Sequence, residues 1–111
     1  MDVIETTPYT GLRYNKDKPE LSMVLEARRA LEGCANVLAF GKKKYSRKNW
    51  LKGLGQVGIV DSLMRHLTAY MDNEDIDKET QLAHVDHILC NALFLSQMYH
   101  TRPDTDDRVR L

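Results

Sequence analysis

Apolar residues recur at helical spacing in three stretches of the chain, and these stretches predict its helices. The first predicts a helix over about residues 21–40, with Gly41 as a natural stop signal. Its apolar stripe consists of Leu21, Val24, Leu25, Leu31, Ala35 and Leu38. The second predicts a helix over about residues 56–71. Its stripe consists of Val57, Val60, Leu63, Met64, Leu67 and Met71. Both stripes are typical of amphipathic helices that bury one face.

The third stretch predicts a helix over about residues 78–100, with Asp77 as its N-cap. One face of this helix would carry His84, His87, Ile88, Asn91, Leu95 and Met98. The opposite face would carry Leu82, Leu89 and Leu93, with Asp86 among them. A helix that is apolar on two sides needs cover on two sides, so we expect self-association with this helix at or near the interface.

The segments outside these helices are polar. Residues 1–20 contain Pro8, Gly11 and Pro19 and predict an irregular arm, and residues 103–111 form a short charged tail. We therefore expect a single all-α domain over residues 1–111, with three main helices that assemble into an oligomeric helical bundle.

Composition narrows the class of protein. Sixteen basic and 16 acidic residues give a formal net charge of zero, which disfavours a protein that coats duplex nucleic acid. No apolar run approaches the roughly 20 residues that span a bilayer, and the N-terminus does not resemble a signal peptide. Cys34 and Cys90 fall within apolar helical patterns and are expected to be buried free thiols. These features predict a cytoplasmic protein.

Basic side chains concentrate between the first two predicted helices. Residues 42–52 contain Lys42, Lys43, Lys44, Arg47, Lys48 and Lys52, with Tyr45 and Trp50 between them. The segment is either a solvated loop or a grip for phosphate with an aromatic platform for a base. Arg28 also has two possible interpretations. It projects into the apolar stripe of the first helix, either to pair with Glu32 or to bind an anionic ligand in a cleft.

Acidic side chains concentrate before the third helix. The segment 72–79 carries five of them, Asp72, Glu74, Asp75, Asp77 and Glu79. Helix capping explains one or two, and binding of Mg²⁺ or Mn²⁺ is the competing interpretation for the others.

His84, His87 and Asn91 form the most informative constellation, because they share one face of an otherwise apolar helix. Histidine can ligate a metal, transfer a proton near neutral pH or donate to phosphate. His66 of the second helix is a further candidate for this group. The pattern has no cysteine ligands and no His-Glu-x-x-His sequence, so it does not match a structural zinc motif.

Several blocks along the chain carry a family resemblance. They are Gly11-Leu12-Arg13-Tyr14 with Lys18-Pro19, Phe40-Gly41-x-x-Lys44-Tyr45-x-x-x-Asn49-Trp50, Arg65-His66-Leu67-x-Ala69-Tyr70, Glu74-Asp75-x-Asp77-x-Glu79-Thr80, and His84-x-x-His87-x-x-x-Asn91-Ala92-x-Phe94-Leu95. In order and number these blocks resemble the phage-encoded dATP/dGTP diphosphohydrolase N-terminal-type family, which is distantly similar to the MazG-type all-α nucleoside triphosphate pyrophosphohydrolases.

The resemblance implies a phage or prophage enzyme that binds a nucleotide, uses Mg²⁺ or Mn²⁺ and releases pyrophosphate. His84, His87 and Asn91 would then be catalytic, and Glu74, Asp75 and Asp77 would hold the metal. The substrate and its phosphates would be bound by Arg13, Lys18, Arg28, Lys44, Tyr45, Asn49, Trp50, Arg65 and His66.

Two other functions remain open. The chain has no Glu-x-x-Glu helix of the MazG type, and its third helix carries histidines and Asn91 where such enzymes carry acids. This departure favours a non-catalytic oligomer that sequesters a nucleotide, such as an immune signalling nucleotide. A helical interaction protein, in which the buried polar groups specify register, is the second alternative.

Overall fold

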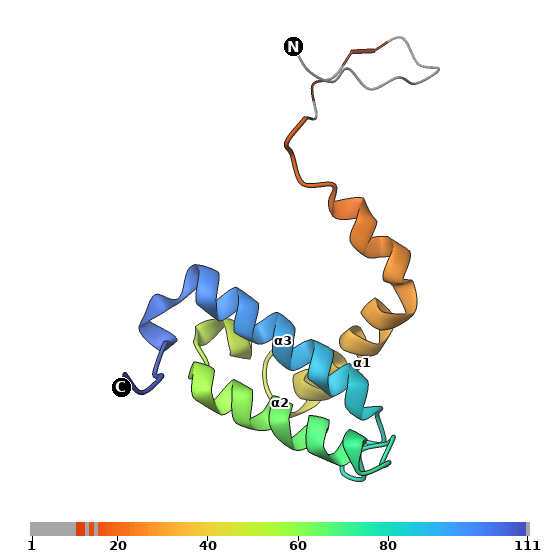
Figure 1. Ribbon diagram of the computed structural model, residues 1–111, viewed down its shortest axis with the longest axis vertical. Coiled ribbons are helices and arrows are strands. Elements are labelled where there is room, and N and C mark those ends of the chain that lie inside the picture. The colour runs from red at the N-terminus through yellow and green to blue at the C-terminus, as the bar shows by residue number, and fades with distance from the viewer. Residues whose placement is uncertain (1–10, 13, 15, 111) are drawn as a thin grey trace.

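The computed structural model describes residues 11–12, 14 and 16–110 of the chain. In this part the fold is all-helical (Figure 1). The elements follow the order 3₁₀ helix η1 (Leu21–Ala27), α1 (Arg28–Lys44), 3₁₀ helix η2 (Asn49–Lys52), α2 (Gln56–Met71), α3 (His84–Thr101) and 3₁₀ helix η3 (Pro103–Thr105). Among these described elements, no helix combines the length and the apolar character that crossing a bilayer would need.

Helices α2 and α3 run antiparallel and lie side by side, while α1 approaches them from the projecting η1 and packs against α3 (Figure 1). The side chains of Cys34, Ile59, Cys90 and Met98 are buried between the helices. The two cysteines are free and in contact, which confirms that they are buried thiols. Burial, with Cys34 beside it, raises the pKa of the Cys90 thiol to about 12.

The first predicted helix is correct in type, but both of its ends differ. It begins with the 3₁₀ turns of η1, becomes α-helical at Arg28 and continues past Gly41 to Lys44. Gly41 keeps a helical conformation, and its carbonyl accepts the Tyr45 N–H at 2.8 Å. Three lysines in the last turn favour this continuation, because cations stabilise the negative end of the helix dipole.

The apolar stripe of this helix is buried only in part. Leu21, Val24 and Leu25 are 77%, 55% and 60% exposed, because η1 projects away from α2 and α3 (Figure 1). The first turns of the predicted stripe therefore contact no core in the described chain.

Helix α2 matches its predicted bounds, whereas α3 begins at His84 and not near residue 78. The backbone of Gln81 explains this later start of α3. Gln81 has a φ of 62°, a left-handed conformation that an α-helix cannot contain. Asp77 is therefore not the N-cap of α3. It caps a separate turn, in which its Oδ2 accepts the Thr80 N–H at 2.9 Å.

Gly53 gives the fold a testable weak point. It joins η2 to α2 with a φ of 115°, and a Cβ there would lie 3.0 Å from Nη2 of Arg102. We expect Gly53→Ala to lower the free energy of unfolding by roughly 1–3 kcal/mol, because this backbone conformation suits glycine alone. Gly58→Ala is the matched control: a Cβ there meets open space within α2, so a gain of about 0.5–1 kcal/mol is expected. Urea titrations of both variants check the difference, and equal effects would contradict it.

Candidate functional site

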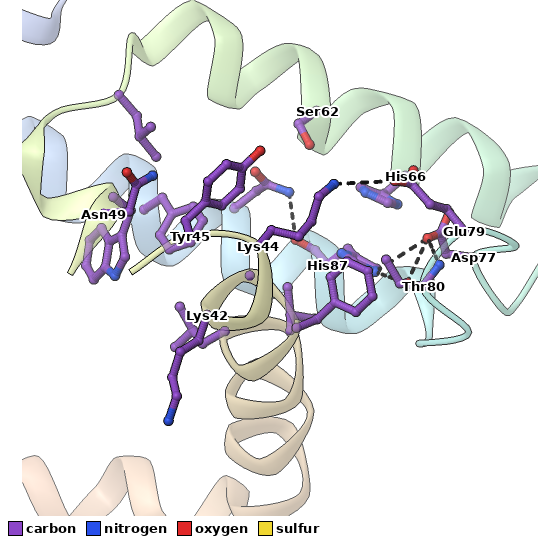
Figure 2. A pocket seen from close by; sticks show the side chains of 18 of the residues that line it. Lys42, Lys44, Tyr45, Asn49, Ser62, His66, Asp77, Glu79, Thr80 and His87 are labelled. Atoms are coloured by element: carbon purple, nitrogen blue, oxygen red, sulfur yellow. Dashed lines mark hydrogen bonds and ion pairs between the residues drawn. The ribbon is translucent and has the colours of Figure 1, made fainter. Parts of the chain in front are cut away.

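A cavity of about 620 Å³ lies between the C-terminal end of α1, η2, α2 and the first half of α3 (Figure 2). Its size falls in the range of small-molecule sites. It is lined by most of the residues that the sequence nominated, namely Lys44, Tyr45, Asn49, Trp50, Arg65, His66, Glu74, Asp77, His84, His87 and Asn91. The fold thus brings together side chains from segments up to 47 positions apart in the sequence.

The other nominated residues do not line this cavity. Arg28 is exposed at the first turn of α1, and Lys18 is exposed in the arm. Asp75 is exposed as well, and it contributes its backbone carbonyl, which accepts the His84 N–H at 2.9 Å. Arg13 lies outside the described residues.

His84 occupies the centre of a histidine–carboxylate cluster at one end of the cavity. Its side chain is buried, and its Nε2 donates to Oε2 of Glu74 at 2.7 Å. The Nδ1 atoms of His66 and His84 lie 2.9 Å apart. When the ring of His84 is neutral, the Nε2 proton lies in the hydrogen bond to Glu74, and the lone pair on Nδ1 faces His66. The same hydrogen bond from His84 holds the pKa of Glu74 below its ordinary value.

Two further hydrogen bonds join Asp77, Thr80 and His87 in series (Figure 2). The Thr80 hydroxyl donates to Oδ2 of Asp77 at 2.7 Å and lies 2.7 Å from Nε2 of His87. Since the hydroxyl has a single proton, His87 must donate from Nε2, which leaves the lone pair of its neutral ring on Nδ1. Burial acts to raise the pKa of Asp77, but the Thr80 hydrogen bonds outweigh it and lower that pKa.

The rings of His66 and His87 stack, with centroids 4.2 Å apart and planes 3° from parallel. Burial lowers the pKa of His66, and the neighbouring His87 lowers it further. Burial also lowers the pKa of His87, although Asp77 acts in the opposite direction. Both rings are therefore neutral at pH 7, which suits metal ligation or proton acceptance.

These lowered pKa values predict how stability depends on pH. The folded chain binds fewer protons at His66 and His87 than the unfolded chain does below the ordinary value of 6.5, so stability falls as pH falls. We expect the metal-free chain to have a lower free energy of unfolding at pH 5 than at pH 7. The lowered pKa values of Glu74 and Asp77 affect stability mainly at lower pH, because the ordinary pKa values of these groups are 4.5 and 3.8.

Urea titrations at pH 7, 6 and 5 measure this dependence. The His66→Gln/His87→Gln double variant should weaken it, whereas the control His100→Gln, at an exposed position of α3, should retain it. An unchanged slope in the double variant would contradict the assignment.

Aromatic side chains line the cavity beside η2, and the basic side chains reach toward the histidines. The Trp50 ring lies 4.8 Å from that of Phe94 with a tilt of 32°. The Lys44 ammonium is exposed and lies 3.8 Å from Oε1 of Glu79 (Figure 2). Lys44 and Arg65 both line the cavity and can meet an anion that enters from solvent.

Asn91 has a local partner. Its Nδ2 donates to the backbone carbonyl of His87 at 2.9 Å, one turn earlier in α3. This bond fixes the amide beside the cavity wall, and the catalytic role of Asn91 stays a prediction.

Sequence reasoning missed Thr80 and Phe94 as members of the site. Phe94 continues the helical stripe of His84, His87 and Asn91, so its spacing could have revealed it. Thr80 follows Asp77 by three residues, a spacing typical of side-chain-capped turns. Its bond to His87 depends on how the loop folds back onto α3, which no local pattern indicates.

Comparisons with known proteins give consistent findings. The sequence model of the family described as dATP/dGTP diphosphohydrolase, N-terminal, matches residues 8–108. A curated protein of Salmonella phage PMBT28, named dATP/dGTP diphosphohydrolase, is 35% identical over 99 residues. That alignment covers 89% of this chain and 33% of the relative, so the chain spans about a third of the length of the curated relative. No solved structure matches the chain.

Proposed function

Because this chain belongs to the family described as dATP/dGTP diphosphohydrolase, N-terminal, we propose that its cavity binds a deoxynucleoside triphosphate and hydrolyses it. One observation carries the proposal: a single cavity joins an aromatic wall to a histidine–carboxylate cluster with basic side chains beside it. The aromatic wall can stack a base, the basic side chains can bind the phosphates, and the histidines can move a proton.

We assign the base to Trp50 and Phe94 and the phosphates to Lys44 and Arg65. Aromatic rings bind any base through stacking, and lysine and arginine are the usual partners of phosphate oxygens. Lys44 lies only 3.8 Å from Glu79 in an exposed ion pair, which costs little to exchange for a phosphate contact.

In the proposed reaction a water oxygen attacks the α-phosphorus, and the bond from that phosphorus to the α–β bridging oxygen breaks. The products are a nucleoside monophosphate and pyrophosphate. His87 accepts the proton of the attacking water on Nδ1, while Thr80 and Asp77 hold its ring from the other side. A bound divalent cation would neutralise phosphate charge and activate the water, with Asp77 as a carboxylate that could hold it.

Direct analysis of the products tests this function. The chain is incubated with dATP or dGTP in the presence of Mn²⁺, and the products are separated by ion exchange. We expect equal amounts of monophosphate and pyrophosphate. Release of inorganic phosphate alone, or no turnover at micromolar protein, would refute the proposal.

Binding without cleavage is the second candidate, and one observation favours it. Each acidic side chain of the cavity already has a polar partner. Glu74 accepts a hydrogen bond from His84, Asp77 accepts one from Thr80, and Glu79 forms an ion pair with Lys44. A site with so little free carboxylate resembles a receptor more than a MazG-type metal centre. Calorimetry followed by quantitative recovery of intact nucleotide would support this candidate.

We also propose that the chain self-associates. Val57, Val60 and Met64 of α2 and Val85 and Leu93 of α3 are all exposed. Contact with a second copy would remove these apolar side chains of two adjacent helices from water, which favours association. Light scattering after size exclusion is expected to give at least twice the monomer mass. A monomer at all concentrations would refute the proposal and also the helical interaction protein that is the third candidate.

A further inference from the structure

Three ligating side chains converge where α2 and α3 meet through their connecting loop. His66 comes from α2, Asp77 from the loop and His84 from the first residue of α3. One ligand atom of each lies within 4.8 Å of the other two. The position of these atoms at the wall of the cavity would leave a bound ion one side open to a ligand.

Glu74 prepares His84 for ligation. Its Oε2 accepts a hydrogen bond from Nε2 at 2.7 Å, so the neutral ring of His84 presents its Nδ1 lone pair to His66. Metal-binding histidines normally have such a carboxylate partner on the second ring nitrogen, because it fixes the tautomer and the ring orientation. The hydrogen bond between the two histidines does not prevent ligation by His66, since its ring can carry the proton on Nε2 when Nδ1 binds an ion.

Backbone hydrogen bonds hold the loop that carries Asp77 and leads into His84. The Asp77 N–H donates to the Leu82 carbonyl at 2.8 Å, and the Gln81 N–H returns to the Asp77 carbonyl at 2.8 Å. The His84 N–H donates to the Asp75 carbonyl at 2.9 Å. Asp77 and His84 are thus positioned by the loop itself, and binding would order few additional groups.

The donor atoms select the class of ion. Mg²⁺, Ca²⁺ and Mn²⁺ prefer oxygen ligands, whereas the later first-row metals such as Zn²⁺ and Ni²⁺ bind imidazole nitrogen well. We propose that His66, Asp77 and His84 bind one divalent transition-metal ion, such as Zn²⁺, with an open position toward the cavity. Of the predicted set Glu74, Asp75 and Asp77, this proposal keeps Asp77 as a ligand and gives Glu74 the role of orienting His84. The inference deepens the proposed function, on which its catalytic meaning rests.

The distances require only a small adjustment. A tetrahedral ion with metal–nitrogen bonds of about 2.0–2.1 Å places two ligand nitrogens roughly 3.3 Å apart. The Nδ1 atoms of His66 and His84 are 2.9 Å apart, so they need to separate by a few tenths of an ångström. Small rotations of the two side chains provide this, because His66 is only half-buried.

A titration with Co²⁺ tests the site without any nucleotide. The tag-free chain is stripped with chelator, and visible absorption is recorded as Co²⁺ is added. We expect one equivalent to give strong bands that Zn²⁺ abolishes and excess Mg²⁺ does not. His66→Gln and Asp77→Asn should each weaken Co²⁺ binding by at least roughly 100-fold. Loss of a hydrogen-bond partner of a ligand already lowers metal affinity by about 10–100-fold, and loss of the ligand itself should cost more. Glu74→Gln removes such a hydrogen-bond partner and should weaken Co²⁺ binding by only about 10–100-fold.

His100→Gln is the matched control, because His100 is an exposed histidine of the same helix and should leave the titration unchanged. Circular dichroism confirms that each variant is folded. Absence of the bands, or bands that both His66→Gln and Asp77→Asn retain, would overturn the metal site. Metal binding without nucleotide cleavage would overturn the proposed function alone, and cleavage by a chain that binds no Co²⁺ or Zn²⁺ would overturn the metal site alone.

Discussion

Replacing His87 with glutamine is expected to lower the turnover of dATP by about 100- to 10,000-fold at pH 7, the usual contribution of a general acid–base group. His87 is neutral at this pH because burial lowers its pKa, and its Nε2 is fixed by Thr80 at 2.7 Å. Glutamine can keep the contact with Thr80, but it cannot accept the proton of the attacking water. The loss should therefore fall on kcat, with KM nearly unchanged.

Steady-state kinetics on dATP measure this split, with His100→Gln as the control that should match the original chain. The Thr80→Val variant provides a further comparison, since it removes the bond that orients His87 and keeps the ring. We expect it to lose less activity than His87→Gln. A His87→Gln variant with full kcat would exclude His87 as the proton acceptor.

Replacing Trp50 with alanine is expected to raise the Kd for dATP by roughly 5- to 150-fold, the equivalent of about 1–3 kcal/mol of stacking on one base. Trp50 lies against Phe94, with ring centroids 4.8 Å apart, at the end of the cavity away from the histidines. Its loss should weaken the affinity for dATP, dGTP and adenosine alike, because each presents a base.

Trp50→Phe and Tyr99→Ala separate stacking from general damage. Trp50→Phe keeps a ring and should lose only a small part of the affinity, whereas Tyr99 is 63% exposed in α3 and does not line this cavity. Calorimetry on folded variants gives the Kd values. Equal affinities of Trp50→Ala and Tyr99→Ala would show that the base binds elsewhere.

The sequence predicts helix type well and helix ends less well. Periodicity alone gives α2 its observed bounds, since a long apolar stripe follows directly on Gly53 and Gly55. The same periodicity extends too far before α3, because the left-handed Gln81 leaves no mark in the apolar pattern. The periodicity also predicts that the apolar side chains near residues 21–25 are buried. They are exposed, because η1 does not reach another surface of the fold.

The site is predictable where its members share one helix. The spacing of His84, His87 and Asn91 is enough to place them on one helix face. The approach of His66 and Glu74 depends on the packing of α2 against α3 and on the path of the loop, which are tertiary features. The phosphate roles of Arg28 and Lys18 receive no support from the cavity, since the fold places both away from it.

In the proposed function one cavity holds the base at Trp50 and the phosphates toward the histidines. Trp50 is the only tryptophan of the chain, so its indole N–H gives a single, assigned signal in a ¹⁵N-correlated NMR spectrum. The most direct test is to follow this signal together with the His84 and His87 ring signals during a titration with dATP. We predict that all three shift with one common Kd, while the ring signal of His100 stays in place. Saturable dATP binding that leaves the Trp50 indole unmoved would contradict the account.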